Sequence, residues 1–496
     1  MGALSKLLFS VLLLAPAQHE GVLDSVQARY LEVMGAAPRE GLPWAILRLD
    51  EIAVRSPSAS FTPRILETIQ AVALLHPGSV PDHMARFEKM KQQAATDPNL
   101  NKVVKRLEIL RSYFLAAAED PPRSIKVDFD NQSLEGSILT WRAKADSAFR
   151  RGDYLQAESL AFEIVEADPF SALNASAYAL LGLCESCLGN AQKAAGYLQK
   201  AANVSPLPTL YGKTQDYLTT LFRFVRPGAN PAGSPFEELA PAKITGAAPL
   251  KDPRSLQRQG ERFILIDRDQ VLVVSLEGKV VETKPGRRIE DLADAGSGKI
   301  YYLADDFVDL NTGSPTRVSH TVAGKPKLLS KLRSLALDAD GAIYFLDQDA
   351  GLLVGKIASG SSLSVRPIAP NRGSLVRIDR RGYILVLSAD QRSIAILSRE
   401  GKMLTTLAPS VPSGKEPSIE FFALDSLNHV YILDSLSNSI QIFAFSQGSG
   451  GLDKTRIANL QLDPRPHHKN LRVLSVSATG DIVAAGKNED YWIVYR

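Results

Sequence analysis

The chain contains few of the residues from which disulfide scaffolds and metal centres are built. Its 496 residues include two cysteines, Cys184 and Cys187, and seven scattered histidines. One possible disulfide cannot replace a hydrophobic core, so the stability of the folded chain must come from buried apolar side chains. The sequence has no His-Glu-x-x-His metal motif and no Gly-x-Ser-x-Gly nucleophile motif. We therefore assign no catalytic residue, no metal ligand and no cofactor, and we expect a protein that is not an enzyme.

Strong charge and long apolar runs are absent as well. The net charge is +3 and no block of basic residues occurs, which argues against nucleic-acid binding. A helix that crosses a bilayer needs about 20 apolar residues, and no stretch of the chain approaches that length, so no transmembrane span is expected. The length and a hydrophobic content of 45% instead predict two or three ordinary soluble domains.

Residues 1–17 have the pattern of a secretory signal peptide. Lys6 precedes the apolar run 7–14, and Ala15-Pro16-Ala17 forms a small-x-small cleavage site. Cleavage before Gln18 would release a periplasmic or secreted protein. An uncleaved anchor and a buried first helix remain alternative interpretations. No cysteine follows the apolar run, so this is not the site of a lipoprotein anchor.

Residues 18–122 are predicted to form helical hairpins of uncertain type. Apolar residues recur at three- and four-residue spacing in 44–52 and again in 103–110, and prolines interrupt the region at helix-length intervals. No repeat within the region aligns, so we expect helices here without assigning them to a family.

Residues 138–225 contain a helical repeat. The segment Trp141–Ala157 aligns with Tyr178–Ala194 at an offset of 37 residues, with an aromatic residue, a small residue, a glycine and an alanine in step. Gly152 and Gly189 predict the turns between paired helices. The pattern resembles the tetratricopeptide repeat (TPR), whose unit is about 34 residues long.

The TPR resemblance implies a concave groove, lined by the first helix of each unit, that receives peptides. By register, the residues that face this groove are Arg142, Asp146, Phe149 and Arg150 in the first unit and Ala179, Leu183 and Cys187 in the second. A structural cap with a solvated helix face remains an equal alternative.

Cys184 and Cys187 fall mid-helix in this register. Packing is a better interpretation of the pair than redox or metal chemistry, because reactive Cys-x-x-Cys pairs sit at helix N-termini.

The sequence changes character after residue 225. Residues 226–253 are rich in proline and glycine and predict a linker. From residue 254 to 496 the apolar period is two, and strand–turn–strand units recur. Their turn residues are Gly260, Gly298, Gly341, Gly382, Asn428 and Gly480. These turns demand a positive φ, which Gly and Asn tolerate. Six such units predict a six-bladed β-propeller.

The repeated unit, a strand followed by Asp-x-x-Gly-x-Ile-Tyr-x-x-Asp, resembles the NHL repeat over residues 254–496. Ser388 and Gly486 stand where other units carry the second Asp. The NHL resemblance implies a ring of six blades whose rim loops bind protein or another polymer. The last unit has only three strands. We therefore expect a segment near Ala242-Lys243-Ile244-Thr245 to supply its outer strand and close the ring.

These features predict an α-helical TPR-like solenoid followed by an all-β propeller, in an exported, non-catalytic scaffold for protein–protein interactions. Envelope or secretion-system components are the partners that this location suggests. One alternative, implied by some NHL-type propellers, is a metal-dependent lyase or hydrolase with His, Asp and Glu facing the central channel. Another is a cell-wall polysaccharide-binding module, which needs exposed aromatic residues, and the chain has three tryptophans. The pair His467-His468 is expected in a solvated loop rather than in a metal site.

Overall fold

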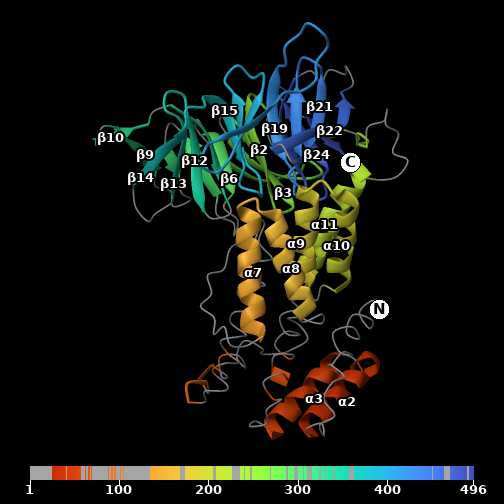
Figure 1. The fold of residues 1–496 in the computed structure, drawn as a ribbon. Helices are drawn as coiled ribbons and strands as arrows, with labels where there is room; N and C mark the ends of the chain where they lie inside the picture. Colours follow the sequence, from red (N-terminus) through yellow and green to blue (C-terminus); the bar gives the residue numbers. More distant parts are fainter. Residues whose placement is uncertain are drawn as a thin grey trace. The chain divides into compact units, whose positions relative to one another are not determined.

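The structure is a computed structural model of the chain, and Figure 1 shows helices followed by β-sheets. It describes residues 25–40, 42–56, 134–167, 174–204, 208–225 and most of 235–496, with isolated positions between 62 and 104. The breaks within 235–496 fall at 240, 246–248, 269, 286–288, 295–299, 305–306, 310–314, 323–324, 330, 339–340, 357–361, 449–450, 463–467, 469 and 489–490. The signal peptide expected at 1–17, and most of the helical region expected at 18–122, lie outside the described residues.

The described helices contribute to two compact units. They are α2 (Ser25–Glu40), α3 (Leu42–Arg55), α7 (Leu134–Arg150), α8 (Tyr154–Ala167), α9 (Asn174–Cys187), α10 (Ala191–Val204) and α11 (Pro208–Val225). The first unit comprises Met1–Asp146, Ala157–Leu181 and Gly196–Gln215, and the second comprises Ser147–Gln156, Gly182–Ala195 and Asp216–Arg496. Each helix from α7 to α11 therefore has one end in the second unit. In the part of the chain that the structure describes, no helix is long and apolar enough to span a membrane.

Helices α2 and α3 pack together in the first unit. Val26 and Val33 of α2 share a buried cluster with Ile46, Leu49 and Ile52 of α3. These spacings place the apolar side chains of each helix on one face, as expected for an amphipathic pair. The pair is the continuously described part of the region in which helical hairpins were expected.

Helices α7–α8 and α9–α10 are joined by glycine turns. Gly152 and Gly189 have φ values of +80° and +84°, a left-handed conformation that glycine adopts without steric cost. Ala145, Ala157 and Ala194 are fully buried. Small side chains at these positions allow close helix packing, as the aligned sequence segments suggested.

The strands of the second unit form a β-propeller, whose sheets are labelled in Figure 1. One sheet holds β2 (Pro253–Gln259), β3 (Arg262–Asp267), β4 (Gln270–Ser275) and β5 (Val280–Pro285). A nine-stranded sheet holds β6 (Ile289–Asp294), β7 (Ile300–Ala304), β8 (Phe307–Asp309), β9 (Pro315–Val322), β10 (Lys325–Leu328), β11 (Leu332–Leu337), β12 (Ala342–Asp347), β13 (Gly351–Lys356) and β14 (Ser362–Ala369). A third holds β15 (Gly373–Ile378), β16 (Ile384–Ser388), β17 (Ile394–Leu397) and β18 (Met403–Leu407). A fourth holds β19 (Ile419–Leu424), β20 (Val430–Asp434), β21 (Ser439–Gly448) and β22 (Gly451–Gln461). The fifth holds β23 (Leu471–Val476), β24 (Ile482–Gly486), β25 (Tyr491–Tyr495) and β1 (Ala242–Lys243).

Counted by sheets, the described propeller has five, whereas six separate blades were expected. The runs β6–β9 and β11–β14 are each antiparallel, but β9 and β14 then pair in parallel, with Arg317 opposite Ser362 and His320 opposite Val365. Unpaired strand edges invite association, and this pairing covers two edges at once. The first strands, β2, β6, β11, β15, β19 and β23, contact one another in a closed cycle.

The glycine and asparagine turns adopt the backbone conformation predicted from the sequence. The values of φ lie between +58° and +82° at Gly260, Gly341, Gly382, Asn428 and Gly480. Gly298 lies outside the described residues. Side chains of the repeat then stabilise the turns. Asp379 Oδ1 accepts hydrogen bonds from two amides of its own turn, both at 2.9 Å. In the next connection, between β16 and β17, Ser388, which stands where other units carry the second Asp, accepts from two amides at 3.2 and 3.1 Å.

The ring is closed by the segment that precedes β2. Strand β1 pairs antiparallel with β25, with Ala242 opposite Trp492, and the Leu239 amide donates to the Val494 carbonyl at 2.9 Å. This is the segment from which the sequence led us to expect a closing strand. Trp492 is fully buried, and its indole N–H donates to the Leu276 carbonyl at 2.9 Å. The closing strand thus lies over a packed core.

His468 is buried, and the expectation of a solvated loop was wrong for this residue. Its exposed fraction is 2%. The imidazole Nε2 lies 3.2 Å from the hydroxyl of Tyr495 and 3.2 Å from Glu238 Oε2. Burial of a histidine is tolerated when its ring nitrogens have polar partners, and here the closing segment provides Glu238 and strand β25 provides Tyr495 as partners of Nε2. His467 lies outside the described residues.

Candidate functional site

Turns of the helices and turns of the propeller meet within the second unit. The helix residues are Tyr154, Cys187, Tyr217 and Arg223, and the propeller residues are the turns 379–383, 425–429 and 477–481. Each of these turns joins the first and second strands of a sheet. We call this set of residues the junction.

Helix α11 is held to the last propeller turn by a buried ion pair. Arg223 Nη2 lies 3.0 Å from Asp481 Oδ1 and donates to the Thr479 carbonyl at 3.2 Å. The exposed fractions of the Arg223 and Asp481 side chains are 10% and 3%. The Arg223 guanidinium also lies over the Phe236 ring, 4.9 Å from its centroid. A pair so sheltered from water is far more sensitive to loss of one partner than a surface pair.

Arg380 provides a second contact with α11. Its Nη1 donates to the hydroxyl of Tyr217, and its guanidinium lies 5.0 Å from the centroid of the Tyr217 ring. The backbone N–H of Arg380 donates to Asn428 Oδ1 at 2.9 Å. Adjacent propeller turns are therefore linked to each other as well as to the helix.

The centre of the junction is a buried arginine–aspartate pair beside a thiol and a phenol. Arg381 and Asp379 are joined at 2.6 Å and are both buried. Burial opposes the charge on Arg381, but the Asp379 carboxylate outweighs it, so the pKa of Arg381 is raised. Burial raises the pKa of the Cys187 thiol to about 11, although Arg381 opposes the shift. Burial and then the neighbouring Cys187 raise the pKa of Tyr154. The thiol and the phenol are thus neutral at physiological pH, and neither is activated as a nucleophile.

The turn 425–429 is built around a second buried carboxylate. Asp425 Oδ2 lies 2.8 Å from His429 Nδ1 and accepts from the Tyr431 hydroxyl at 3.0 Å. Burial opposes ionisation of Asp425, but the charge and hydrogen bonds of His429 outweigh it and hold the pKa of this carboxyl below its ordinary value. The His429 ring packs edge-on against Phe224 of α11, with centroids 5.0 Å apart. This turn also contacts the helix side.

The residues predicted to face a TPR-like groove are divided between the two units. In the first unit, Arg142 Nη2 pairs with Asp146 Oδ1 at 2.9 Å, and Arg142 Nη1 donates to the Ser176 carbonyl at 2.6 Å. Arg142 is buried and Asp146 is partly exposed. Ala179 is buried as well.

The remaining groove residues lie in the second unit. Phe149 is buried and packs edge-on against Tyr154. Cys187 is buried and accepts a long hydrogen bond from Asn428 Nδ2 at 3.8 Å, so it lies in the junction. Arg150 and Leu183 are partly exposed. A groove role stays a prediction for all seven residues, of which Asp146, Arg150 and Leu183 are the partly exposed ones.

The two cysteines are not mid-helix as expected. Cys187 is the last residue of α9 and Cys184 lies one turn before it. Both are buried and neither forms a disulfide. A helix C-terminus carries partial negative charge and disfavours a thiolate, which agrees with packing rather than redox chemistry.

Four residues of the junction were not recognised from the sequence. They are Tyr217, Arg223, Arg380 and Arg381. One signal was available in the sequence, the pair Arg380-Arg381 inside an Asp-x-x-Gly turn. Two adjacent positive charges in a turn that has a structural role suggest that each binds a polar or acidic partner nearby. The sequence separation of Arg223 and Asp481, which is 258 residues, concealed the other contact.

The interior of the ring is occupied by an ion pair. Asp291 of β6 is buried and accepts from Arg377 Nη1 of β15 at 2.9 Å. It also accepts from the hydroxyl of Ser255 at 2.6 Å and from that of Ser334 at 2.5 Å. Arg377 therefore reaches past β11 to contact β6, and it stacks over the Phe421 ring at 5.6 Å. Among the described residues, no group of three or more His, Cys, Asp or Glu side chains is arranged to hold a metal ion.

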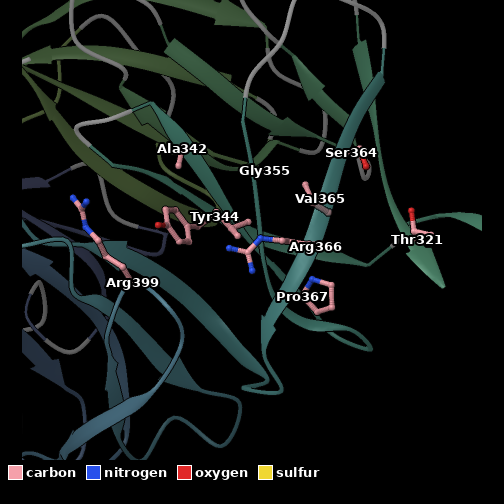
Figure 2. Close-up of a pocket in the computed structure, with 10 residues that line it drawn as sticks. Thr321, Ala342, Tyr344, Gly355, Ser364, Val365, Arg366, Pro367 and Arg399 are labelled. Carbon is pink, nitrogen blue, oxygen red and sulfur yellow. The ribbon is translucent and has the colours of Figure 1, made fainter. Parts of the chain in front are cut away.

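A hollow of about 590 Å³ lies against strands of the nine-stranded sheet (Figure 2). It is lined by Thr321, Ala342, Tyr344, Val354, Gly355, Ser364, Val365, Arg366, Pro367 and Arg399. The lining comes from β9 and from β12–β14, with Arg399 from the turn between β17 and β18. A concave site of this size is in the range that holds small ligands or short peptide segments.

No protein-family model and no curated protein sequence matches the chain. Among solved structures, the chain is similar to virginiamycin B lyase from Staphylococcus aureus, with 11% identity over 52% of this chain and 98% of that one, at a TM-score of 0.34. It is similar to the Cps50 (Swd1) beta-propeller domain of Myceliophteria thermophila, with 12% identity over 52% and 98%, and a TM-score of 0.35. It is also similar to the RRP9 WD40 repeats, with 14% identity over 52% and 99%, and a TM-score of 0.35. Likenesses this distant carry no argument about activity.

Proposed function

We propose that the chain is an exported, non-catalytic scaffold that binds protein partners through TPR-like helices and a six-bladed, NHL-like propeller. The observation that carries the proposal is the junction. Helix turns and propeller turns are joined by buried charged and polar groups, among them Arg223 with Asp481. Such contacts fix geometry without providing a reactive group, which is what a scaffold needs.

The NHL-like assignment counts the nine-stranded sheet as two blades. The closed cycle of first strands supports this count, because β6 and β11 occupy separate positions in it. The TPR-like assignment is supported by two helical hairpins whose turn glycines are 37 residues apart and share a left-handed conformation.

The ion pair inside the ring disfavours the lyase or hydrolase alternative. A channel enzyme uses inward-facing ligands for a metal or a substrate, whereas here Asp291 is already bonded to Arg377 and two hydroxyls. Metal analysis of the purified full-length protein tests this point. A stoichiometric, tightly bound transition metal would contradict a non-catalytic scaffold.

Export is tested with the full chain fused to alkaline phosphatase, an enzyme that becomes active only outside the bacterial cytoplasm. The fusion is expected to be active, and a matched fusion that lacks residues 2–17 is expected to be inactive. Equal activity of the two fusions would contradict a signal peptide at this position.

Partner binding is tested by capture on the tagged full chain from the exported or envelope fraction of the source cells. We expect a discrete protein in stoichiometric amount that is displaced by untagged chain. Recovery of only substoichiometric, non-displaceable proteins would argue against a scaffold.

A further inference from the structure

The hollow in Figure 2 lies over one face of the β12–β14 part of the nine-stranded sheet. Tyr344, Val354 and Arg366 are cross-strand neighbours, since Tyr344 pairs with Val354 and Val354 with Arg366. Directly opposed residues on adjacent strands point to the same face of a sheet. The three side chains therefore form a continuous row along the floor of the hollow.

The hollow is open to solvent because neighbouring elements cover the two ends of strand β14 but not its middle. At its start, residues 362–365 pair with β9. At its end, the turn between β17 and β18 approaches so closely that a Cβ on Gly401 would lie 2.4 Å from the Ile368 carbonyl oxygen. Arg366 and Pro367 lie between these covers and are exposed. The hollow is thus a gap between these two elements.

The charge of the lining has one sign. Among the lining residues that the structure describes, the ionised side chains are Arg366 and Arg399, both basic, and none is a carboxylate. Arg399 has interactions within the chain, so we assign the ligand contact to the exposed Arg366. An arginine favours a carboxylate, which it binds through a planar fork of N–H donors.

Apart from the arginines and the hydroxyl-bearing Thr321 and Ser364, the described lining is mostly apolar. Val354 and Pro367 flank Arg366, and the hydroxyl of the buried Tyr344 is directed to Asp338 Oδ2 at 3.4 Å, which leaves its ring towards the hollow. In Figure 2 the Tyr344 ring lies between Arg366 and Arg399. A side chain with apolar atoms can therefore pack beside the carboxylate contact.

We propose that this hollow binds a short peptide segment of a protein partner, in which an acidic side chain contacts Arg366 and an adjacent apolar side chain packs on Tyr344 and Val354. This rests on the proposed scaffold function and specifies its partner chemistry. The volume admits a few residues and not a folded domain.

The experiment selects random heptapeptides, displayed on phage, on the immobilised full-length protein. Selected peptides are then synthesised with fluorescein and titrated by fluorescence anisotropy. We expect Asp or Glu next to an apolar residue in the selected peptides. Arg366→Ala should weaken binding about tenfold, the size of one charge-assisted hydrogen bond, and Arg366→Glu should weaken it further. Lys415→Glu, an exposed basic residue outside the lining, should change the dissociation constant less than about twofold.

A charge swap separates direct contact from general loss of structure. A peptide with Lys in place of its acidic residue should bind Arg366→Glu better than the wild type. Failure to select any peptide, or peptides that bind Arg366→Glu as well as the wild type, would overturn the assignment of the hollow. Peptides that bind independently of Arg366 would contradict the assignment of the hollow but not the scaffold function. The capture experiment described above tests the scaffold function separately.

Discussion

At the scale of single residues, buried aspartates in this protein are paired with arginines. Arg377 and Arg223 each neutralise a buried aspartate from a distant part of the chain, 86 residues away for Asp291 and 258 for Asp481. The sequence suggested neither pair, because a charged residue in a strand or helix does not reveal which of many opposite charges it will meet. Only the closed ring brings them together. Residues with local partners, such as Asp379 in its own turn, were identified from the motif.

Replacement of Arg377 by Met should lower the free energy of unfolding by about 3–5 kcal/mol, because the Asp291 carboxylate stays buried without a counter-charge. Urea denaturation measures the loss. Arg392→Met is the matched control, since Arg392 pairs with Glu416 at 2.6 Å but the two side chains are 52% and 64% exposed. The control should lose less than about 1 kcal/mol. Similar losses for both variants would show that the interior pair is not important for stability.

Stability should fall in alkali because of Cys187. Burial raises its pKa from 9.0 to about 11, so the folded state keeps the proton that the unfolded state releases. The stabilising contribution is complete below pH 9 and is lost as pH rises towards 11. The advantage of the wild type over Cys187→Ala should therefore shrink by about 2–3 kcal/mol between pH 8.5 and 11. A difference that does not change with pH would mean that the thiol ionises as readily in the folded protein.

At the scale of elements, turns were more predictable than sheets. The tight turn at Gly341 or Asn428 is fixed by the need for a positive φ within four residues, and the structure confirms it. By contrast, the strands β6–β9 and β11–β14 form one sheet because the edge strands β9 and β14 come close enough to pair. The apolar period of a strand does not indicate which other strand its edge will pair with. The sequence therefore predicted two separate blades where the structure has one sheet.

Two turn glycines separate backbone strain from close packing. Gly401 has a φ of +85° and a Cβ there would lie 2.4 Å from a backbone oxygen, whereas Gly341 has a φ of +77° and open space around it. Gly341→Ala should lose about 1–2 kcal/mol from the left-handed conformation alone. Gly401→Ala should lose about 1–3 kcal/mol more, because the backbone must move. Thermal unfolding of the two variants gives the comparison, and equal losses would contradict close packing of Gly401 against the Ile368 carbonyl.

At the scale of the whole molecule, the ring depends on a strand supplied from its other end. The three-stranded count of the last unit pointed to this closure, since an odd unit leaves an edge that must be covered. What the sequence did not show is the extent of the covering, which includes Glu237 and Leu239 as well as β1.

Leu239→Pro should weaken the closure, because proline cannot donate the hydrogen bond that now reaches the Val494 carbonyl. We expect a loss of about 1–3 kcal/mol and greater protease sensitivity near β25. Leu239→Ala keeps the N–H and should lose less than about 1 kcal/mol, since Leu239 is 37% exposed. If alanine is as damaging as proline, the side chain and not the strand pairing is responsible.

The pairing of Ala242 with Trp492 also sets an order of events during synthesis. The segment around β1 leaves the ribosome long before its partner exists, and it must wait, unpaired, while every intervening strand is made. Arg223 of α11 lacks its partner for a similar time, because Asp481 is translated almost as late as β25. Until β25 is made, β1 has no partner strand and the ring stays open. The order of the chain therefore makes ring closure one of the last steps of folding.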